Sequence, residues 1–123
     1  MILVDTSIWV DHLRSGDDLL SHLLARGEVL AHPFVIGELA LGHLRRREAV
    51  LHSLHRLPQA AVARDREVLL MIDRHHLAGA GIGYVDAHLL AAVRLTGDAR
   101  FWTRDRRLLT IAERLSVAAP VPH

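Results

Sequence analysis

Four acidic residues, spread along the chain, occupy positions that an α/β fold would bring together. They are Asp5, Glu38, Asp86 and Asp105, and each follows an apolar strand or lies on the apolar side of a helix. A solitary charge is costly in such surroundings, and neighbouring carboxylates raise one another's pKa values. Hard divalent cations prefer oxygen ligands and relieve this repulsion. The pattern predicts a Mg²⁺ or Mn²⁺ site, which suits phosphodiester cleavage.

Each acid also has an ordinary structural explanation. Asp5 and Asp105 suit the N-cap of a following helix, and Asp86 would be stabilised by the dipole at a helix start. Glu38 shares a helical face with apolar residues, which predicts a buried or half-buried carboxylate. The alternative for Glu38 is an exposed position on a helix whose buried face is rotated. No single acid is specific, whereas four that converge would be.

The elements that must position these acids are short apolar strands separated by amphipathic helices. We expect strands at residues 2–4, 28–31, 59–62, 100–103 and 115–118. One intervening helix begins at Pro33 and is expected to run to about Leu44. Alternation of this kind predicts an α/β fold, a three-layer α/β/α sandwich with a central parallel sheet. Ligands bind beyond the carboxyl ends of such strands, so Asp5 and Asp105 should face one crevice.

Composition limits the class of protein further. The 123 residues fit a single domain, 1–123, and contain no cysteine, which excludes disulfides and thiolate metal sites. All fifteen basic residues are arginine. A P-loop and a receiver-type phosphoacceptor domain both need a lysine, so both are excluded. No apolar run approaches the ~20 residues of a membrane helix. We therefore expect a cytoplasmic protein that makes no use of a membrane.

Four short segments of the chain resemble, in order, the acidic motifs of the PIN-domain nucleases. They are Asp5-Thr6-Ser7, Gly37-Glu38-Leu39, Asp86-Ala87-His88 and Thr103-Arg104-Asp105. Chain length and motif order are similar to those of the VapC-type toxins of bacterial VapBC toxin–antitoxin pairs. The resemblance covers residues 1–118. It implies a PIN-like fold and a Mg²⁺- or Mn²⁺-dependent endoribonuclease that acts as the toxin of a type II pair.

The resemblance also implies roles for particular residues. Asp5, Glu38, Asp86 and Asp105 would be the catalytic and metal-binding acids, with Asp105 the most peripheral. Ser7 and Thr103 match hydroxyl positions that orient the acids. The expected partners are the RNA substrate and a VapB-type antitoxin that blocks the site. Homodimers, and a heterotetramer or larger assembly with the antitoxin, are implied as well.

Arginines near the fourth acid are candidates for substrate contact. Arg104, Arg106 and Arg107 flank Asp105, and arginine suits phosphate groups. The run Arg45-Arg46-Arg47 is expected to end a helix, where cations suit the dipole. Two rival functions remain open. One is a catalytically silent PIN-like module that binds an antitoxin or RNA without cleaving it. The other, an acidic-pocket phosphatase, is disfavoured by the missing lysine and by the lack of a second aspartate two residues after Asp5.

Overall fold

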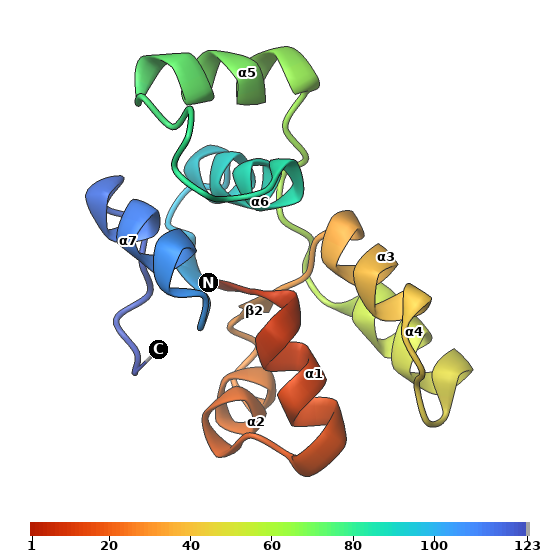
Figure 1. Cartoon of the computed structure of the whole chain (residues 1–123). Helices are drawn as coiled ribbons and strands as arrows, with labels where there is room; N and C mark the ends of the chain where they lie inside the picture. The colour runs from red at the N-terminus through yellow and green to blue at the C-terminus, as the bar shows by residue number, and fades with distance from the viewer. Residues whose placement is uncertain (123) are drawn as a thin grey trace.

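A short parallel sheet forms the centre of the molecule. In the computed structural model, which describes residues 1–122, strand β1 (Ile2–Val4) lies between β2 (Val29–Leu30) and β3 (Arg100–Trp102). Both strand pairs are parallel. Helices lie around this sheet (Figure 1), and the expected α/β fold with a central parallel sheet is confirmed. The carboxyl ends of β1 and β3 therefore open at the same edge.

The two outermost predicted strands are reduced to single bridges. Gln59 pairs in parallel with Ala31, and Ala118 pairs in parallel with Phe101, where the sequence predicts strands at 59–62 and 115–118. Pro58 and Pro120 flank these bridges. Proline has no amide to donate and restricts the backbone, which keeps an edge strand from extending. The order nevertheless runs outward from β1 in both directions, as in a doubly wound sheet.

Seven helices are found within residues 1–122. They are α1 (Thr6–Ser15), α2 (Asp18–Ala25), α3 (Pro33–Leu41), α4 (Arg47–Arg56), α5 (Asp65–Arg74), α6 (Tyr84–Leu95) and α7 (Arg106–Arg114). Figure 1 shows α3 beside α4 and α5 beside α6, and both pairs are in contact. No helix in the described part of the chain is long and apolar enough to cross a membrane.

The sheet and helix α6 are the most completely buried parts of a core to which every helix contributes. Leu3, Val4 and Phe101 of the sheet are completely buried, and Trp102 is almost so. Seven consecutive residues of α6, numbers 87–93, are also buried. A helix that is apolar on all sides must be covered on all sides. This central position of α6 fixes the helix that carries Asp86 against the strand ends that carry Asp5.

Helix α3 ends earlier than the sequence predicts. It stops at Leu41 rather than near residue 44, and Gly42 caps it by donating its amide to the Leu39 carbonyl. Arg46 then takes a left-handed conformation (φ 52°) at the N-cap of α4. The arginine run thus begins a helix instead of ending one, and the expectation that it suits a helix C-terminus is wrong. The early end of α3 is explained by Gly42, because glycine loses more backbone freedom in a helix than any other residue.

Candidate active site

Asp5 lies at the carboxyl end of β1 and is one of the few buried charged groups among the described residues. It is only 8% exposed. Its Oδ2 accepts a hydrogen bond from Thr103 Oγ1 at 2.7 Å, and its Oδ1 accepts one from the Thr6 amide at 2.8 Å. Burial raises the pKa of Asp5, these two bonds oppose the rise, and repulsion from Asp86 and Glu38 adds to it.

Asp86 lies in the first turn of α6, half-buried. Its Oδ2 accepts a hydrogen bond from the Gly83 amide at 3.1 Å. Burial raises the pKa of Asp86, the Gly83 bond lowers it, and the charges of Asp105 and Glu38 raise it again. Asp86 is therefore both an acid at the start of a helix and one member of the acidic group. Neither explanation excludes the other.

Glu38 is exposed, and the expectation of a buried or half-buried carboxylate is wrong. The buried face of α3 consists of Val35, Ile36 and Leu39. Glu38 lies on the side that faces the other acids, where its Oε1 accepts a hydrogen bond from Thr6 Oγ1 at 2.7 Å. The residue still joins the acidic group, because its charge acts on both Asp5 and Asp86.

Asp105 is the exposed N-cap of α7. Its Oδ1 accepts a hydrogen bond from the Leu108 amide at 3.0 Å, which is ordinary capping. Its own amide donates to Thr103 Oγ1 at 3.1 Å. Its charge reaches Asp86. Asp105 is thus at the edge of the group and engaged in a structural role as well.

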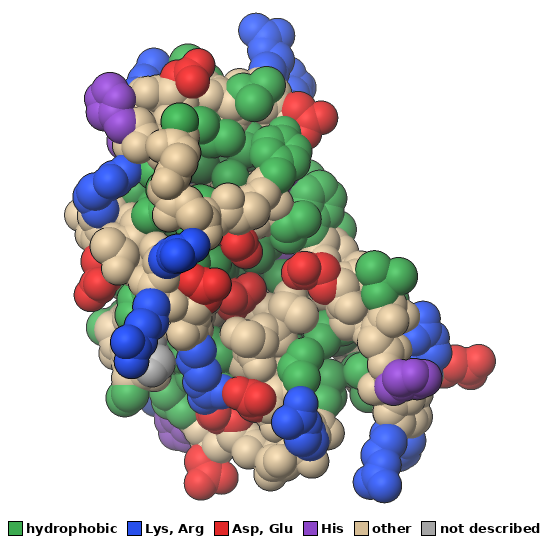
Figure 2. All heavy atoms as spheres, in the orientation of Figure 1, with side chains coloured by type: hydrophobic (Ala, Val, Ile, Leu, Met, Phe, Trp, Pro, Cys, Tyr) green, Lys and Arg blue, Asp and Glu red, His purple; other side chains and the backbone are tan. Residues whose placement is uncertain are grey.

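Together the four carboxylates, from four separate segments, form one electrostatic cluster. Figure 2 shows acidic side chains gathered near the middle of this face, with arginine side chains below them and to the left. The donor set is all oxygen, which fits a hard divalent cation.

The carboxylates do not converge on a single point. Within residues 1–122, no three acidic or histidine side chains lie close enough together to share one ion. Each carboxylate is instead turned toward a backbone or hydroxyl donor, as expected of like charges that repel. Cation binding would bring the four carboxylates closer together than they lie here.

The supporting hydroxyls are only partly those expected. Thr103 is fully buried and donates to Asp5, as a residue that orients this acid should. Ser7 is exposed, and its hydroxyl makes no hydrogen bond to the four acids within residues 1–122. Thr6 bonds Glu38 instead, a contact that sequence reasoning missed. The adjacent hydroxyls of the Asp5-Thr6-Ser7 segment were the available signal.

The three arginines near Asp105 are placed differently from one another. Arg104 binds Asp11 Oδ2 at 2.6 Å and Asp17 Oδ2 at 2.7 Å, so its guanidinium is engaged. Arg107 lies against the backbone of Gly81, where an added Cβ would come 2.7 Å from its Nη1. Gly81 also has a φ of +83°, which favours glycine. Arg106 and Arg107 are both exposed at the start of α7.

A second cluster, of polar and aromatic side chains, connects helix α6 to helices α5 and α3. The Tyr84 hydroxyl donates to Asp65 Oδ1 at 2.8 Å, and His88 Nε2 lies 3.0 Å from the same oxygen. The His88 ring packs at 4.8 Å from the ring of Phe34, which lies in the first turn of α3. This contact joins the helices that carry Asp86 and Glu38. Sequence reasoning missed the cluster, because nothing in the chain links residue 65 to residue 88.

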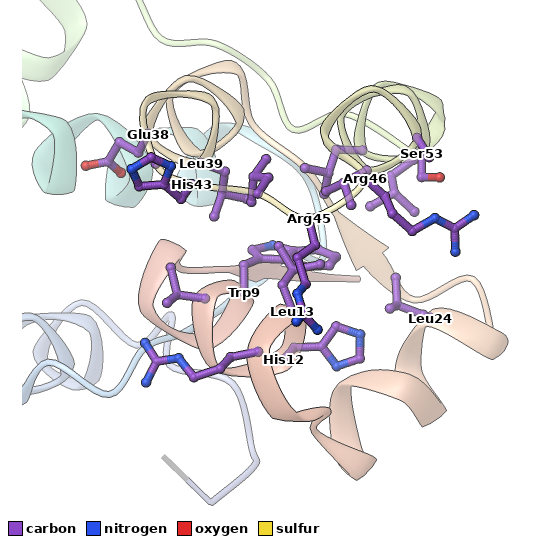
Figure 3. A pocket seen from close by; sticks show the side chains of 18 residues that line it. Trp9, His12, Leu13, Leu24, Glu38, Leu39, His43, Arg45, Arg46 and Ser53 are labelled. Atoms are coloured by element: carbon purple, nitrogen blue, oxygen red, sulfur yellow. The ribbon is translucent and has the colours of Figure 1, made fainter.

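A groove of about 1030 Å³ adjoins the acidic cluster. Figure 3 shows Trp9 and Leu13 of α1 on one wall and Leu39 of α3 on another. Arg45 and Arg46 also line it, with the Arg45 side chain extending toward α1 in this view, and Glu38 lies at one end with its carboxylate directed out of the groove. Its lining therefore combines apolar and basic side chains.

Comparison with known proteins gives two findings. The PIN-domain family model matches residues 2–114. The chain is also 49% identical over 118 residues to Ribonuclease VapC32 from two strains of Mycobacterium tuberculosis, covering 96% of this chain and 95% of each relative. The match extends over all four acidic segments.

Proposed function

This chain belongs to the PIN-domain family as a VapC-type member, and from that premise we propose that it is a metal-dependent endoribonuclease. It would hydrolyse RNA phosphodiester bonds in the cytoplasm as the toxin of a type II toxin–antitoxin pair. The observation that carries this proposal is the coupling of Asp5, Glu38, Asp86 and Asp105 in one cluster. Near-full-length likeness to a named ribonuclease supports it.

We assign the cation, Mg²⁺ or Mn²⁺, to Asp5, Asp86 and Glu38, with Asp105 at the edge. When bound, such an ion would lower the pKa of a water molecule and offset negative charge on the phosphoryl oxygens. Thr103 holds Asp5 through a buried hydrogen bond, so this carboxylate keeps its orientation. Burial of Asp5 also reduces screening by water, which strengthens its interaction with a cation.

Substrate contact would come from Arg106 and Arg107 at the start of α7. Both are exposed beside Asp105, and arginine pairs with phosphate through parallel hydrogen bonds. Arg104 is a weaker candidate, because its guanidinium already binds two carboxylates. The proposal therefore keeps all three as candidates but ranks Arg104 last.

The partner protein would be a VapB-type antitoxin seated in the groove beside Glu38. Apolar lining residues suit the apolar side of an inserted segment, and the lining residues Arg14, Arg45 and Arg46 suit acidic residues of that segment. Because the groove reaches Glu38, its occupant would extend to the acidic cluster and block it. A homodimer, and a heterotetramer or larger complex with the antitoxin, are part of the proposal and are tested by light scattering.

The alternative is a catalytically silent module that only binds an antitoxin or RNA. All four acids are present, which favours the enzyme. A Mn²⁺ titration of the purified protein followed by calorimetry separates the two, because a silent module would show no cation binding.

The deciding experiment is cleavage of total cellular RNA by the purified protein with Mg²⁺ or Mn²⁺. Discrete fragments should form, and should vanish with EDTA and in Asp5→Asn. Asp98→Asn is the matched control, since Asp98 is exposed and is not among the charges that act on Asp5 or Asp86; it should cleave like the unmodified protein. A folded protein that neither cleaves RNA nor binds a cation would refute the proposal and favour the silent module.

A further inference from the structure

The hydroxyl of Thr6 joins two acid-bearing segments that are far apart in the sequence. Thr6 is the first residue of α1, immediately after Asp5, and it donates to Glu38 Oε1 in the middle of α3 at 2.7 Å. Within residues 1–122 this is the one hydrogen bond that the Glu38 carboxylate makes. The contact therefore determines where that carboxylate points.

Glu38 needs such a restraint more than the other acids do. Its side chain is long and exposed, and it is repelled by the charges of Asp5 and Asp86. Left alone, a flexible carboxylate would swing toward water, away from like charges. A donor attached next to Asp5 pulls it the opposite way, toward the cluster.

Thr6 itself is held firmly enough to act as an anchor. Its amide donates to Asp5 Oδ1 at 2.8 Å, and the Asp5 amide donates to the Trp102 carbonyl of β3 at 2.9 Å. The side chain is β-branched, so its χ1 angle has few alternatives. The next residue, Ser7, is exposed and makes no hydrogen bond to Glu38 within residues 1–122.

We propose that Thr6 is a positioning residue that holds the Glu38 carboxylate within the acidic cluster, ready to bind a divalent cation. The inference rests on the proposed function for its cation, and it assigns to Thr6 the role that family resemblance suggests for Ser7. Outer partners of metal-binding side chains commonly change cation affinity by an order of magnitude or more.

The test compares Thr6→Val, which keeps the shape and removes the donor, with Thr6→Ser, which keeps the donor. Mn²⁺ affinity is measured by calorimetry, and RNA cleavage is measured as a function of Mn²⁺ concentration. Thr6→Val should weaken Mn²⁺ binding about tenfold and raise the Mn²⁺ concentration for half-maximal cleavage similarly, while Thr6→Ser restores both. Thr110→Val is the matched control, because the exposed Thr110 hydroxyl donates only to the Arg106 carbonyl of its own helix.

A double-mutant cycle with Glu38→Ala shows whether Thr6 acts through Glu38. Once Glu38 is removed, Thr6→Val should cause no further loss of Mn²⁺ affinity. Fully additive losses, or a Thr6→Val protein that binds Mn²⁺ as tightly as the unmodified one, would overturn the inference. Absence of RNA cleavage by the unmodified protein would refute the proposed function instead, and the Mn²⁺ affinities would still decide the role of Thr6.

Discussion

Two carboxylates of this protein, Asp5 and Asp86, lie where burial and neighbouring negative charges disfavour their ionised form. The pKa of Asp86 is raised chiefly by burial, and further by Asp105 and Glu38. A raised pKa in a carboxyl group means that its charge destabilises the folded state at neutral pH. Stability is thus given up at the position where a cation would bind, as is common at functional sites.

Asp86→Asn should therefore stabilise the protein while abolishing cleavage. The amide oxygen can still accept the Gly83 hydrogen bond, and repulsion from Asp105 and Glu38 disappears. Because solvent reaches this half-buried group, the gain should not exceed about 1 kcal/mol. Urea unfolding at pH 7 without added cation measures it. An unfolding free energy lower than that of the unmodified protein would contradict the interpretation.

His32 provides a second residue-scale effect, at acid pH. Its ring is completely buried, its Nδ1 accepts a hydrogen bond from the Phe34 amide, and burial, with the neighbouring His88, lowers its pKa from 6.5 to about 4. Because the folded protein favours the neutral His32 ring, the stability that this ring contributes is fully present above pH 6.5, where the ring is neutral in the unfolded chain as well. That stability, up to about 3 kcal/mol, is lost as pH falls from 6.5 to about 4.

His32→Asn tests this, because asparagine can still cap helix α3 but does not titrate. The unfolding free energy of the variant should vary less between pH 6.5 and 4 than that of the unmodified protein. His22→Asn, at an exposed position on α2, is the control and should leave the pH dependence unchanged. Parallel pH profiles for His32→Asn and the unmodified protein would show that His32 is not the titrating group.

At the scale of elements, the Arg104 side chain connects the segment after β3 to helices α1 and α2. It follows β3, stacks on the Trp102 ring, and binds Asp11 of α1 and Asp17, the N-cap of α2. The pKa of Asp17 is lowered, first by its hydrogen bond from the Leu20 amide and then by Arg104. One side chain therefore connects the end of strand β3 to two consecutive helices.

Arg104→Ala should mainly reduce stability, whereas Arg107→Ala should mainly weaken RNA binding. Arg104→Ala should lower the unfolding free energy by about 1 kcal/mol, because partly exposed ion pairs contribute little each, with the KM for RNA little changed. Arg107→Ala should leave stability within about 0.5 kcal/mol and raise KM severalfold, since Arg107 is exposed and makes no ion pair within residues 1–122. Thermal melts and cleavage kinetics measure both, and the reverse pattern would exchange their roles.

The sequence predicts elements that have a strong local pattern, but it does not predict which face of a helix is buried. Ile2–Val4 and Arg100–Trp102 are short apolar runs ending in polar residues, so both strands and the acids beyond them could be expected. In helix α3 the apolar pattern places Leu41 on the buried face, whereas Leu41 is 90% exposed. The buried face is formed by Val35, Ile36 and Leu39 instead, which leaves Glu38 exposed. The Thr6–Glu38 bond spans 32 residues, which no local pattern can indicate.

At the scale of the whole molecule, the acidic cluster and the groove share one wall. Helix α3 contributes Glu38 to the cluster and Leu39 to the groove, on consecutive residues. A chain bound at this end of the groove would lie beside Glu38.

The groove prediction is that Val10→Asn weakens antitoxin binding without reducing cleavage. Val10 lines the groove and is 38% exposed, so its apolar surface is available to a partner and contributes little to the core. Removing that surface should weaken binding of the VapB-type antitoxin about tenfold, measured by calorimetry. Leu69→Asn is the control, because Leu69 is 55% exposed on α5 and does not line the groove. Equal antitoxin affinity in both variants would place the antitoxin elsewhere, whereas selective loss in Val10→Asn, with RNA cleavage intact, would locate inhibition in the groove.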